Sequence, residues 1–369
     1  MTNDYKMKTQ EELRAIALHF EIEGGIKEIK PLGNGLINDT FKIVSDGDND
    51  YVLQRINNAI FTDVELLQHN IECATRHIRE KLAAAGEKDL DRKVLRFIPC
   101  KETGKTYWTD GETYWRVSVF IKNAFTYETV NPEYSYYAGK AFGNFEAMLA
   151  DIPDTLGETI PDFHNMELRA RQLKEAVEAD KAGRMADPEV RAILEDLKPF
   201  EEEMCKAERM YREGLLPKRI CHCDTKVNNM MFDADGNILC VIDLDTLMPS
   251  FVFSDFGDFL RTAANTVAED DPDIKSVDFN MDIFKAFARG YIESAKVFLT
   301  PAEKDNLPYA ACLFPYMQAV RFFADYINGD TYYKIKYPEH NLVRTRNQVA
   351  LFHAAYKKTA EMKDFIEGL

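Results

Sequence analysis

The sequence lacks several features that would assign its 369 residues to a special class of protein. No apolar run approaches the roughly 18 residues of a membrane helix, and residues 1–13 are charged without the apolar segment of a secretory signal. The seven cysteines are odd in number and show no spacing typical of a disulfide or zinc framework. These absences predict a cytoplasmic protein without a membrane partner.

Positive charge is also scarce. There are 46 Lys and Arg residues against 62 Asp and Glu residues, which gives a net charge of −16. This balance opposes binding to nucleic acid or to an anionic membrane. The hydrophobic fraction of 46% is ordinary for a globular chain, and the length favours two lobes over one small core. No internal repeat or low-complexity tract interrupts the chain.

The most informative stretch is residues 219–249, which read RICHCDTKVNNMMFDADGNILCVIDLDTLMP. Two apolar runs, residues 230–232 and 238–242, flank the turn-forming sequence DADGN and predict a β-hairpin. With Asp235 and Gly236 at the tip, the numbers of paired residues should sum to about 471. The hairpin therefore has a defined predicted register.

This register brings oxygen-bearing side chains together. Asn228 or Asn229 lies opposite Asp243, and Asp224 lies a few residues upstream. His222 and Asp224, followed by Asn229 five residues later, match the catalytic-loop pattern of kinases. Phosphoryl transfer needs one carboxylate to take the proton of the acceptor hydroxyl, and an Asn with a second Asp to hold Mg²⁺. We therefore predict Asp224 as the catalytic base and Asn229 and Asp243 as metal ligands, against the alternative of a surface hairpin with solvated acids.

The chain then resembles a known family. CHCDTKVNN and VIDLDT resemble motifs of the aminoglycoside phosphotransferase and choline kinase superfamily, and LDTLMP, SDFGD, RTAANTVAEDD and AVRFFADYINGDTYY are similar to bacterial N-acetylhexosamine 1-kinases. The resemblance implies a bilobal, protein-kinase-like α+β fold. Its N-lobe, residues 1–121, would hold an antiparallel sheet and a helix, and its mainly helical C-lobe, residues 122–369, the catalytic hairpin. It also implies transfer of the γ-phosphoryl group of ATP, with Mg²⁺, to the anomeric C1 hydroxyl of GlcNAc or GalNAc.

In the kinase scheme, the segment 26–44 forms two strands and a flap over the ATP phosphates. Gly33 and Gly35 would lie in the turn of this flap. The match is loose, because Asn38 occupies the position of the third glycine. An ordinary hairpin is the alternative.

The next predicted strand, residues 51–56, lacks the Lys that the scheme places on the nucleotide phosphates. Arg55 is the nearest cation, and Gln54 takes its place if the alternation of the strand runs the other way. A helix predicted over residues 63–85 by its apolar period supplies Glu72 as the partner of the strand cation.

A further strand, residues 114–121, ends at a hinge into the second lobe. Backbone groups from Phe120 to Lys122 are expected to receive adenine. Near the catalytic loop, we assign supporting roles to His222, Asp245 and Asp258, the last paired with Arg261 at the i, i+3 spacing.

The acceptor pocket is predicted on the helix 307–327. Arg321 and Asp325 are four residues apart and share a face of this aromatic-rich helix. Asp224 would also contact the acceptor. An ion pair on the helix surface is the alternative for Arg321 and Asp325.

Other functions remain open on the sequence alone. Choline would require an aromatic cage, yet both tryptophans, Trp108 and Trp115, fall in the predicted N-lobe. An aminoglycoside would suit the acidic C-lobe, and homoserine is a further candidate. A nucleotide-binding pseudokinase would lack one of the three site residues, and all are present. The expected partners are ATP and a small sugar, with the chain as a monomer or weak homodimer.

Overall fold

The computed structural model describes residues 8–33, 38–127 and 130–369. The chain divides into two compact units. The predicted N-lobe, residues 1–121, falls within the first segment of unit 1, and two later segments also belong to that unit. Unit 1 comprises Met1–Thr126, Asp151–Pro161 and Met230–Met248, and unit 2 comprises Tyr127–Ala150, Asp162–Asn229 and Pro249–Leu369.

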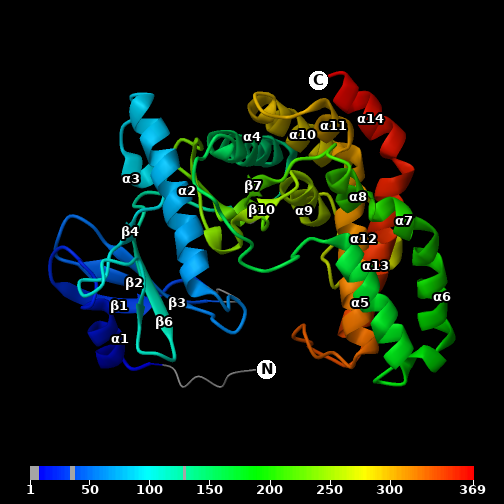
Figure 1. Ribbon diagram of the computed structural model, residues 1–369, viewed down its shortest axis with the longest axis horizontal. Helices are drawn as coiled ribbons and strands as arrows, with labels where there is room; N and C mark the ends of the chain where they lie inside the picture. Colours follow the sequence, from blue (N-terminus) through cyan, green and yellow to red (C-terminus); the bar gives the residue numbers. More distant parts are fainter. Residues whose placement is uncertain (1–7, 34–37, 128–129) are drawn as a thin grey trace. The chain divides into compact units, whose positions relative to one another are not determined.

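Unit 1 is built on an antiparallel sheet with the strand order β1-β2-β3-β6-β4, to which β5 adds by pairing with β6 (Figure 1). The predicted strand 51–56 is confirmed. The helical turn α3 (Leu90–Lys93) precedes the short strand β4. The strands are β1 (Ile26–Pro31), β2 (Asp39–Ser45), β3 (Tyr51–Ile56), β4 (Phe97–Ile98), β5 (Trp108–Thr109) and β6 (Tyr114–Val119).

Helices cover both faces of this sheet. Successive side chains of a strand point to opposite faces. Leu53 and Trp115 belong to the apolar core together with Ile16 of α1 (Gln10–Ala17). On the other face, Arg116 donates a hydrogen bond to Gln68 of α2 (Val64–Ala84). The sheet is thus apolar toward α1 and carries a buried cation toward α2.

The predicted hairpin is also part of unit 1. It consists of β8 (Met230–Phe232) and β9 (Ile238–Val241). Met230 pairs with Val241 and Met231 with Cys240, which confirms the predicted register. A bulge then shifts the pairing so that Phe232 lies opposite Ile238. The short helix η4 (Leu244–Thr246) and β10 (Met248–Ser250) follow the hairpin in the chain.

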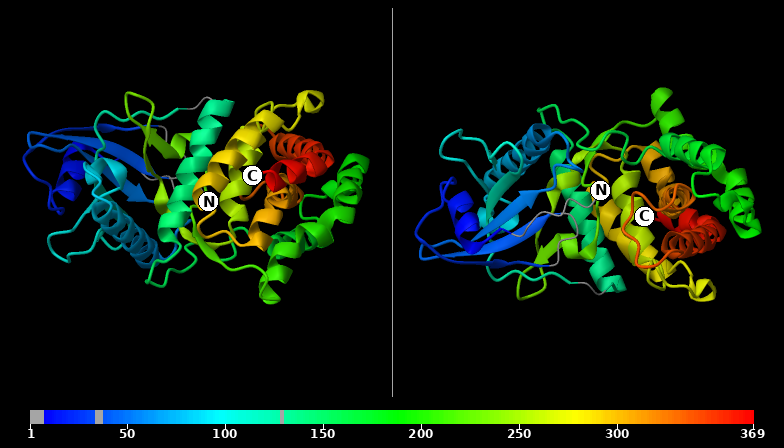
Figure 2. Two further views of the ribbon diagram at one scale, coloured as in Figure 1. Left: turned by 90° about the horizontal axis from the view of Figure 1, so that it is seen from above. Right: turned by 90° about the horizontal axis from the view of Figure 1, so that it is seen from below.

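Unit 2 is mainly helical (Figure 2). Its central helix, α12, is buried along most of its length and packs on α5, α9 and α13. The predicted helix 307–327 is confirmed as α12, and the chain closes with two helices, α13 and α14. The helices are α4 (Pro132–Leu149), α5 (Met166–Ala179), α6 (Pro188–Leu197), α7 (Glu201–Met204), α8 (Lys206–Arg212), α9 (Phe253–Ala263), α10 (Met281–Ala295), α11 (Pro301–Asp305), α12 (Leu307–Ile327), α13 (His340–Lys357) and α14 (Thr359–Glu367).

Two of these helices, α4 and α10, approach each other closely. A Cβ at Gly139 would lie 2.2 Å from the Phe287 carbonyl oxygen, and a Cβ at Gly290 would lie 2.1 Å from the Tyr136 carbonyl oxygen. Only glycine permits this backbone contact.

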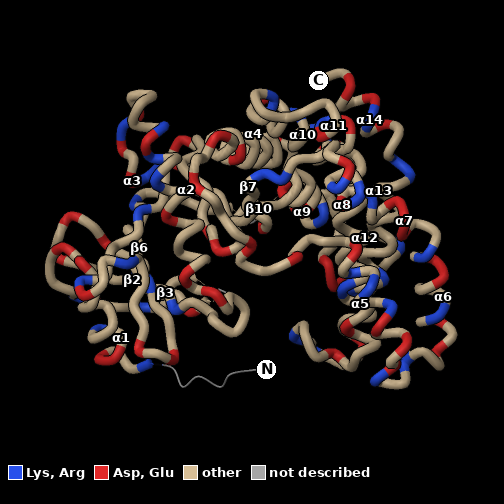
Figure 3. The backbone as a smooth tube through the Cα atoms, viewed as in Figure 1, with Lys and Arg blue, Asp and Glu red and all other residues tan. Residues whose placement is uncertain are grey.

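Acidic and basic residues are interspersed along the backbone of each unit (Figure 3). Within residues 8–33, 38–127 and 130–369, no helix is both long enough and apolar enough to cross a membrane.

Candidate active site

The predicted catalytic loop lies in unit 2, between β7 (Arg219–Cys221) and the short helix η3 (Val227–Asn229). His222 is fully buried, and its ring contacts the rings of Phe142 and Phe145 edge-on. Its Nδ1 atom accepts a hydrogen bond from the Asp224 N–H at 3.3 Å. His222 therefore anchors the backbone at Asp224 to the interior of unit 2.

Asp255, at the start of α9, holds the same loop. Its carboxylate accepts the backbone N–H groups of His222 at 2.8 Å and Cys223 at 2.7 Å. Its carbonyl oxygen accepts the Thr225 hydroxyl at 2.8 Å. Sequence reasoning missed this role, although Asp255 lies in the SDFGD segment that carried the family resemblance. The presence of an acidic residue in this segment was the sequence signal that could have indicated the role of Asp255.

A second buried acid, Glu146 of α4, lies beside Asp255. Burial, followed by the Asp255 carboxylate, raises the pKa of Glu146 well above its usual value. The Tyr291 hydroxyl donates to Glu146. Ligand-type atoms of Glu146, Cys221 and Asp255 lie within 4.8 Å of one another. Because both Asp255 oxygens already accept N–H groups of the loop, we assign Asp255 to anchoring the loop rather than to binding a metal.

Asp224 is surrounded by polar groups of its own loop. The Lys226 ammonium lies 2.5 Å from its carboxylate. Burial disfavours the charged lysine, but the Asp224 and Asp258 carboxylates raise the pKa of Lys226 overall. The Asn229 amide nitrogen donates to the Asp224 carbonyl oxygen at 2.8 Å, which leaves the Asn229 amide oxygen free to face a ligand.

Asp258 and Arg261 form the ion pair predicted from their spacing, at 3.3 Å. Arg261 also pairs with Glu269. Burial raises the pKa of Asp258 to about 6, Arg261 opposes this shift, and the Asp224 carboxylate adds to it. Asp258 is therefore linked electrostatically to the predicted base.

The division between the units falls between Asn229 and Met230, so the predicted ligand Asp243 belongs to unit 1. Asp243 has φ +61°, a left-handed conformation that non-glycine residues seldom adopt. Asp245, two residues later, is buried and lies 2.6 Å from the Arg116 guanidinium. This ion pair, which the sequence did not predict, fixes the turn that follows Asp243.

The residues predicted to contact nucleotide phosphates lie in unit 1. Gly33 has φ +70°, whereas Gly35 lies outside the described residues. Arg55 pairs with Asp39 at 2.6 Å. Glu72 accepts the Thr106 hydroxyl, and a pair between Arg55 and Glu72 is not among the ion pairs of the described residues. Their roles toward ATP stay predictions.

At the predicted adenine position, the Phe120 N–H donates to the Asp50 carbonyl oxygen at 2.9 Å. The Lys42 ammonium lies over the Phe120 ring, 3.7 Å from its centroid. The Lys122 ammonium donates to the Asp48 carbonyl oxygen at 2.7 Å. These contacts fix the strand end, and its adenine contacts stay a prediction.

Arg321 and Asp325 both line a cavity of about 380 Å³ in unit 2, together with Arg169 and Tyr333. Arg321 lies between the rings of Phe163 and Tyr333, 5.6 and 5.7 Å from their centroids. It forms no ion pair with Asp325 among the described residues. Its guanidinium is therefore held in place while donors remain for a ligand.

Asp325 is engaged differently. Its carboxylate accepts the backbone N–H groups of Thr331, Tyr332 and Tyr333 at 2.8–3.0 Å and the Asn341 side chain at 2.9 Å. Four bonds use the lone-pair positions of a carboxylate. Asp325 thus shapes the loop that carries Tyr333, and its direct contact with an acceptor stays a prediction.

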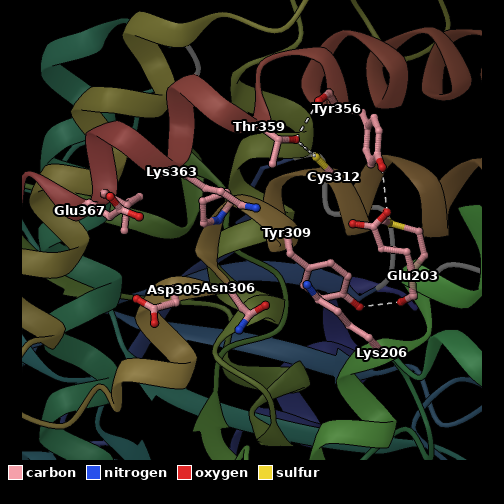
Figure 4. A pocket seen from close by; sticks show the side chains of 13 residues that line it. Glu203, Lys206, Asp305, Asn306, Tyr309, Cys312, Tyr356, Thr359, Lys363 and Glu367 are labelled. Carbon is pink, nitrogen blue, oxygen red and sulfur yellow. Dashed lines mark hydrogen bonds between the residues drawn. The ribbon is translucent and has the colours of Figure 1, made fainter.

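A second cavity of unit 2, of about 330 Å³, contains none of the predicted site residues (Figure 4). Lys206 and Lys363 point into it beside Tyr309, and Tyr356 donates to Glu203 at its edge. We assign no part of phosphoryl transfer to this cavity.

The predicted metal ligands suit a magnesium ion chemically. Mg²⁺ prefers hard oxygen donors such as carboxylate and amide oxygens. Asp243 supplies a carboxylate, and the Asn229 amide oxygen is left available because the amide nitrogen is already bonded. The donor set therefore fits the ion that the kinase scheme requires.

The fold is protein-kinase-like, as predicted. An aminoglycoside phosphotransferase from Alicyclobacillus acidocaldarius subsp. acidocaldarius DSM 446 matches with a TM-score of 0.64 at 14% identity, over 100% of this chain and 99% of that chain. The amicoumacin kinase hAmiN, in complex with AMP-PNP, Ca²⁺ and Ami, matches with a TM-score of 0.59 at 13% identity, over 93% of each chain. A choline/ethanolamine kinase family protein from Mesorhizobium loti matches with a TM-score of 0.54 at 16% identity, over 97% of this chain and 99% of that chain.

Residues 28–291 match the family APH, described as the phosphotransferase enzyme family, and the chain belongs to this family. The matched range includes the predicted catalytic loop, the hairpin and most of the segment predicted as the flap.

Proposed function

We propose that the protein transfers the γ-phosphoryl group of ATP to the anomeric C1 hydroxyl of an N-acetylhexosamine, GlcNAc or GalNAc. Membership of the phosphotransferase family supports phosphoryl transfer. The observation that carries the proposal for this chain is the anchored catalytic loop, in which His222 and Asp255 fix the backbone around Asp224. The sugar is proposed from the resemblance of LDTLMP and AVRFFADYINGDTYY to the hexosamine 1-kinases.

Asp224 would act as the base. Its carboxylate is partly exposed, with 26% of the side-chain area accessible, so an acceptor hydroxyl can reach it. The Lys226 ammonium lies 2.5 Å from this carboxylate, so a cation lies beside the proposed base. Asp224 would orient the hydroxyl and take its proton as the phosphoryl group is transferred.

Asn229 and Asp243 would hold Mg²⁺. Asn229 immediately precedes Met230 in the chain. Met230 pairs with Val241 in the hairpin, and Val241 lies two residues before Asp243. When bound, the ion neutralises charge on the β- and γ-phosphates. The protein's own part would be to supply the Asn229 amide oxygen and the Asp243 carboxylate as ligands.

The cavity beside Arg321 would receive the sugar. Its volume of about 380 Å³ falls in the range of small-molecule pockets, roughly 300–1,000 Å³. The Arg321 guanidinium can donate to a ring hydroxyl and to the acetamido carbonyl, and the Tyr333 ring beside it offers apolar contact.

An acceptor panel tests the proposal. ATP consumption is measured with Mg²⁺ and, in turn, GlcNAc, GalNAc, glucose, choline, homoserine and kanamycin. We expect turnover with the N-acetylhexosamines, and Asp224→Asn is the matched blank for contaminating activity. Turnover confined to choline, homoserine or kanamycin would replace the sugar by that acceptor. ATP binding without turnover of any acceptor would favour a pseudokinase.

A further inference from the structure

Arg116 of β6 forms an ion pair with Asp245 in the interior of unit 1. Only 3% of the Arg116 side chain and 5% of the Asp245 side chain are exposed, and Nη1 lies 2.6 Å from Oδ1. Burial of both charges costs solvation that largely offsets their attraction. The pair is therefore poorly explained as a source of stability alone, and its position indicates another role.

The Arg116 guanidinium joins three elements. Nε donates to the Gln54 side chain of β3 at 3.1 Å, and Nη1 donates to the Gln68 side chain of α2 at 3.2 Å. Asp245 belongs to η4, which follows the hairpin. In protein kinases, a Lys of the third strand pairs with a Glu of the adjacent helix. Here the strand and the helix each present a glutamine, and the buried cation comes from the neighbouring strand β6.

Asp245 has further partners that fix its turn. The Asn38 amide donates to Oδ2 at 2.6 Å, and the Thr159 hydroxyl donates to the Asp245 carbonyl oxygen at 3.2 Å. Asn38 is itself held by the Asn57 N–H at 3.0 Å. The side chain and the backbone of Asp245 are therefore both tied to the sheet unit.

Asp243 begins this turn in a left-handed conformation, with φ +61° and ψ +60°. A non-glycine residue in this region is strained and persists only where its surroundings fix it. Since η4 begins at the next residue, the contacts of Asp245 determine the path of the backbone after Asp243. The backbone conformation of Asp243 is thus followed at once by a turn that Arg116 holds through Asp245.

We propose that Arg116 is a positioning residue that acts through Asp245 to orient the Asp243 carboxylate for a divalent cation. This inference rests on the proposed role of Asp243 as a metal ligand. Partners in the outer shell of a metal site typically change metal affinity by about 10- to 100-fold when they are removed. We expect a loss of this size on removal of the Arg116 guanidinium.

The test is the affinity for Mn²⁺ in the presence of AMP-PNP, measured by calorimetry, with circular dichroism to establish that each variant is folded. Arg116→Gln should weaken Mn²⁺ binding by about 10- to 100-fold. The double variant Arg116→Gln/Asp245→Asn leaves no lone buried charge and should fold while showing a similar loss. Arg116→Lys retains the positive charge beside Asp245 but cannot donate to both glutamines as the guanidinium does. It should therefore retain part of the Mn²⁺ affinity that Arg116→Gln loses.

Two controls separate the possible failures. Arg219→Gln breaks another pair with a buried partner, Glu303 at 2.9 Å, and should lower the melting temperature without changing Mn²⁺ affinity. Asp243→Ala should abolish the nucleotide-dependent Mn²⁺ binding. If Asp243→Ala binds Mn²⁺ like wild type, the proposed metal ligand is wrong and the inference falls with it. If Asp243→Ala loses binding while the folded Arg116 variants retain wild-type affinity, the positioning role alone is overturned.

Discussion

The Asp255 carboxylate accepts the backbone N–H of Cys223 at 2.7 Å, and Cys223 has φ +62°. Cys223 immediately precedes Asp224, so the proposed base follows a strained residue that a buried acid stabilises. Asp243, the proposed metal ligand, is itself left-handed. Both predicted carboxylates therefore lie where the backbone takes a conformation that distant side chains must maintain.

Replacement of Asp255 should impair the loop and its chemistry together. Asp255→Ala leaves the N–H groups of His222 and Cys223 without their acceptor. The unfolding free energy should therefore fall by about 1–3 kcal/mol for each buried group. Asp255→Asn retains one acceptor oxygen and should be intermediate in both unfolding free energy and kcat. Urea denaturation and steady-state kinetics on the folded fraction measure the two quantities. Wild-type kcat in folded Asp255→Ala would refute the anchoring role.

Asp224→Asn tests the base directly. The amide cannot accept the proton of the acceptor hydroxyl, so kcat should fall by about 10²- to 10⁴-fold. The KM for ATP should change little, because Asp224 is proposed to contact the acceptor rather than the nucleotide. A kcat near the wild-type value would remove Asp224 from this role.

Arg321 and Asp325 should respond differently to substitution. Arg321→Ala should raise the KM for the acceptor about 10- to 100-fold, from the roughly 1.5–3 kcal/mol of a charged hydrogen bond, with little change in stability. Arg346→Ala is the control, since Arg346 is an arginine of α13 paired with Glu189 at 2.6 Å. Asp325→Ala should instead lower the melting temperature, because its four N–H donors lose their acceptor. A large loss of stability in Arg321→Ala with unchanged acceptor KM would indicate a structural arginine.

The pH dependence of the unfolding free energy should show a contribution from Asp258. Burial raises its pKa from an ordinary 3.8 to about 6 in the folded protein. Between pH 3.8 and about pH 6, the folded state therefore binds more protons at Asp258 than the unfolded state does. The stabilisation that comes from protonated Asp258 is present in full below pH 3.8, and it is lost as the pH rises through about 6. Asp258→Asn should lack this decline in urea denaturation from pH 4 to pH 7. Parallel profiles for wild type and Asp258→Asn would contradict the raised pKa, and Asp364→Asn, at an exposed acid of α14, serves as the surface control.

Local patterns in the sequence were sufficient for much of the fold. The hairpin register followed from two apolar runs and an Asp-Gly turn, and the strand 51–56 and the helix 307–327 followed from their apolar patterns. The Asp258–Arg261 pair followed from its helical spacing. These features depend on residues that are close together in the chain.

Contacts between distant segments could not be predicted in the same way. Alternation along β6 shows that Arg116 and Trp115 face opposite sides, but it does not show that a turn beyond residue 240 supplies the partner of Arg116. The choice between Arg55 and Gln54 was open for the same reason, and the structure bonds Gln54 to Arg116 while Arg55 pairs with Asp39. The anchoring of the catalytic loop by Asp255 likewise depends on the packing of α9.

The position of the transferred phosphate tests the central proposal most directly. Phosphorus NMR of a reaction with ATP, Mg²⁺ and GlcNAc should show a sugar phosphate whose phosphorus couples to the anomeric proton, and Asp224→Asn should yield none within the same time. A phosphate coupled to the C6 protons, or no sugar phosphate while ATP is consumed with another acceptor, would contradict phosphorylation at C1.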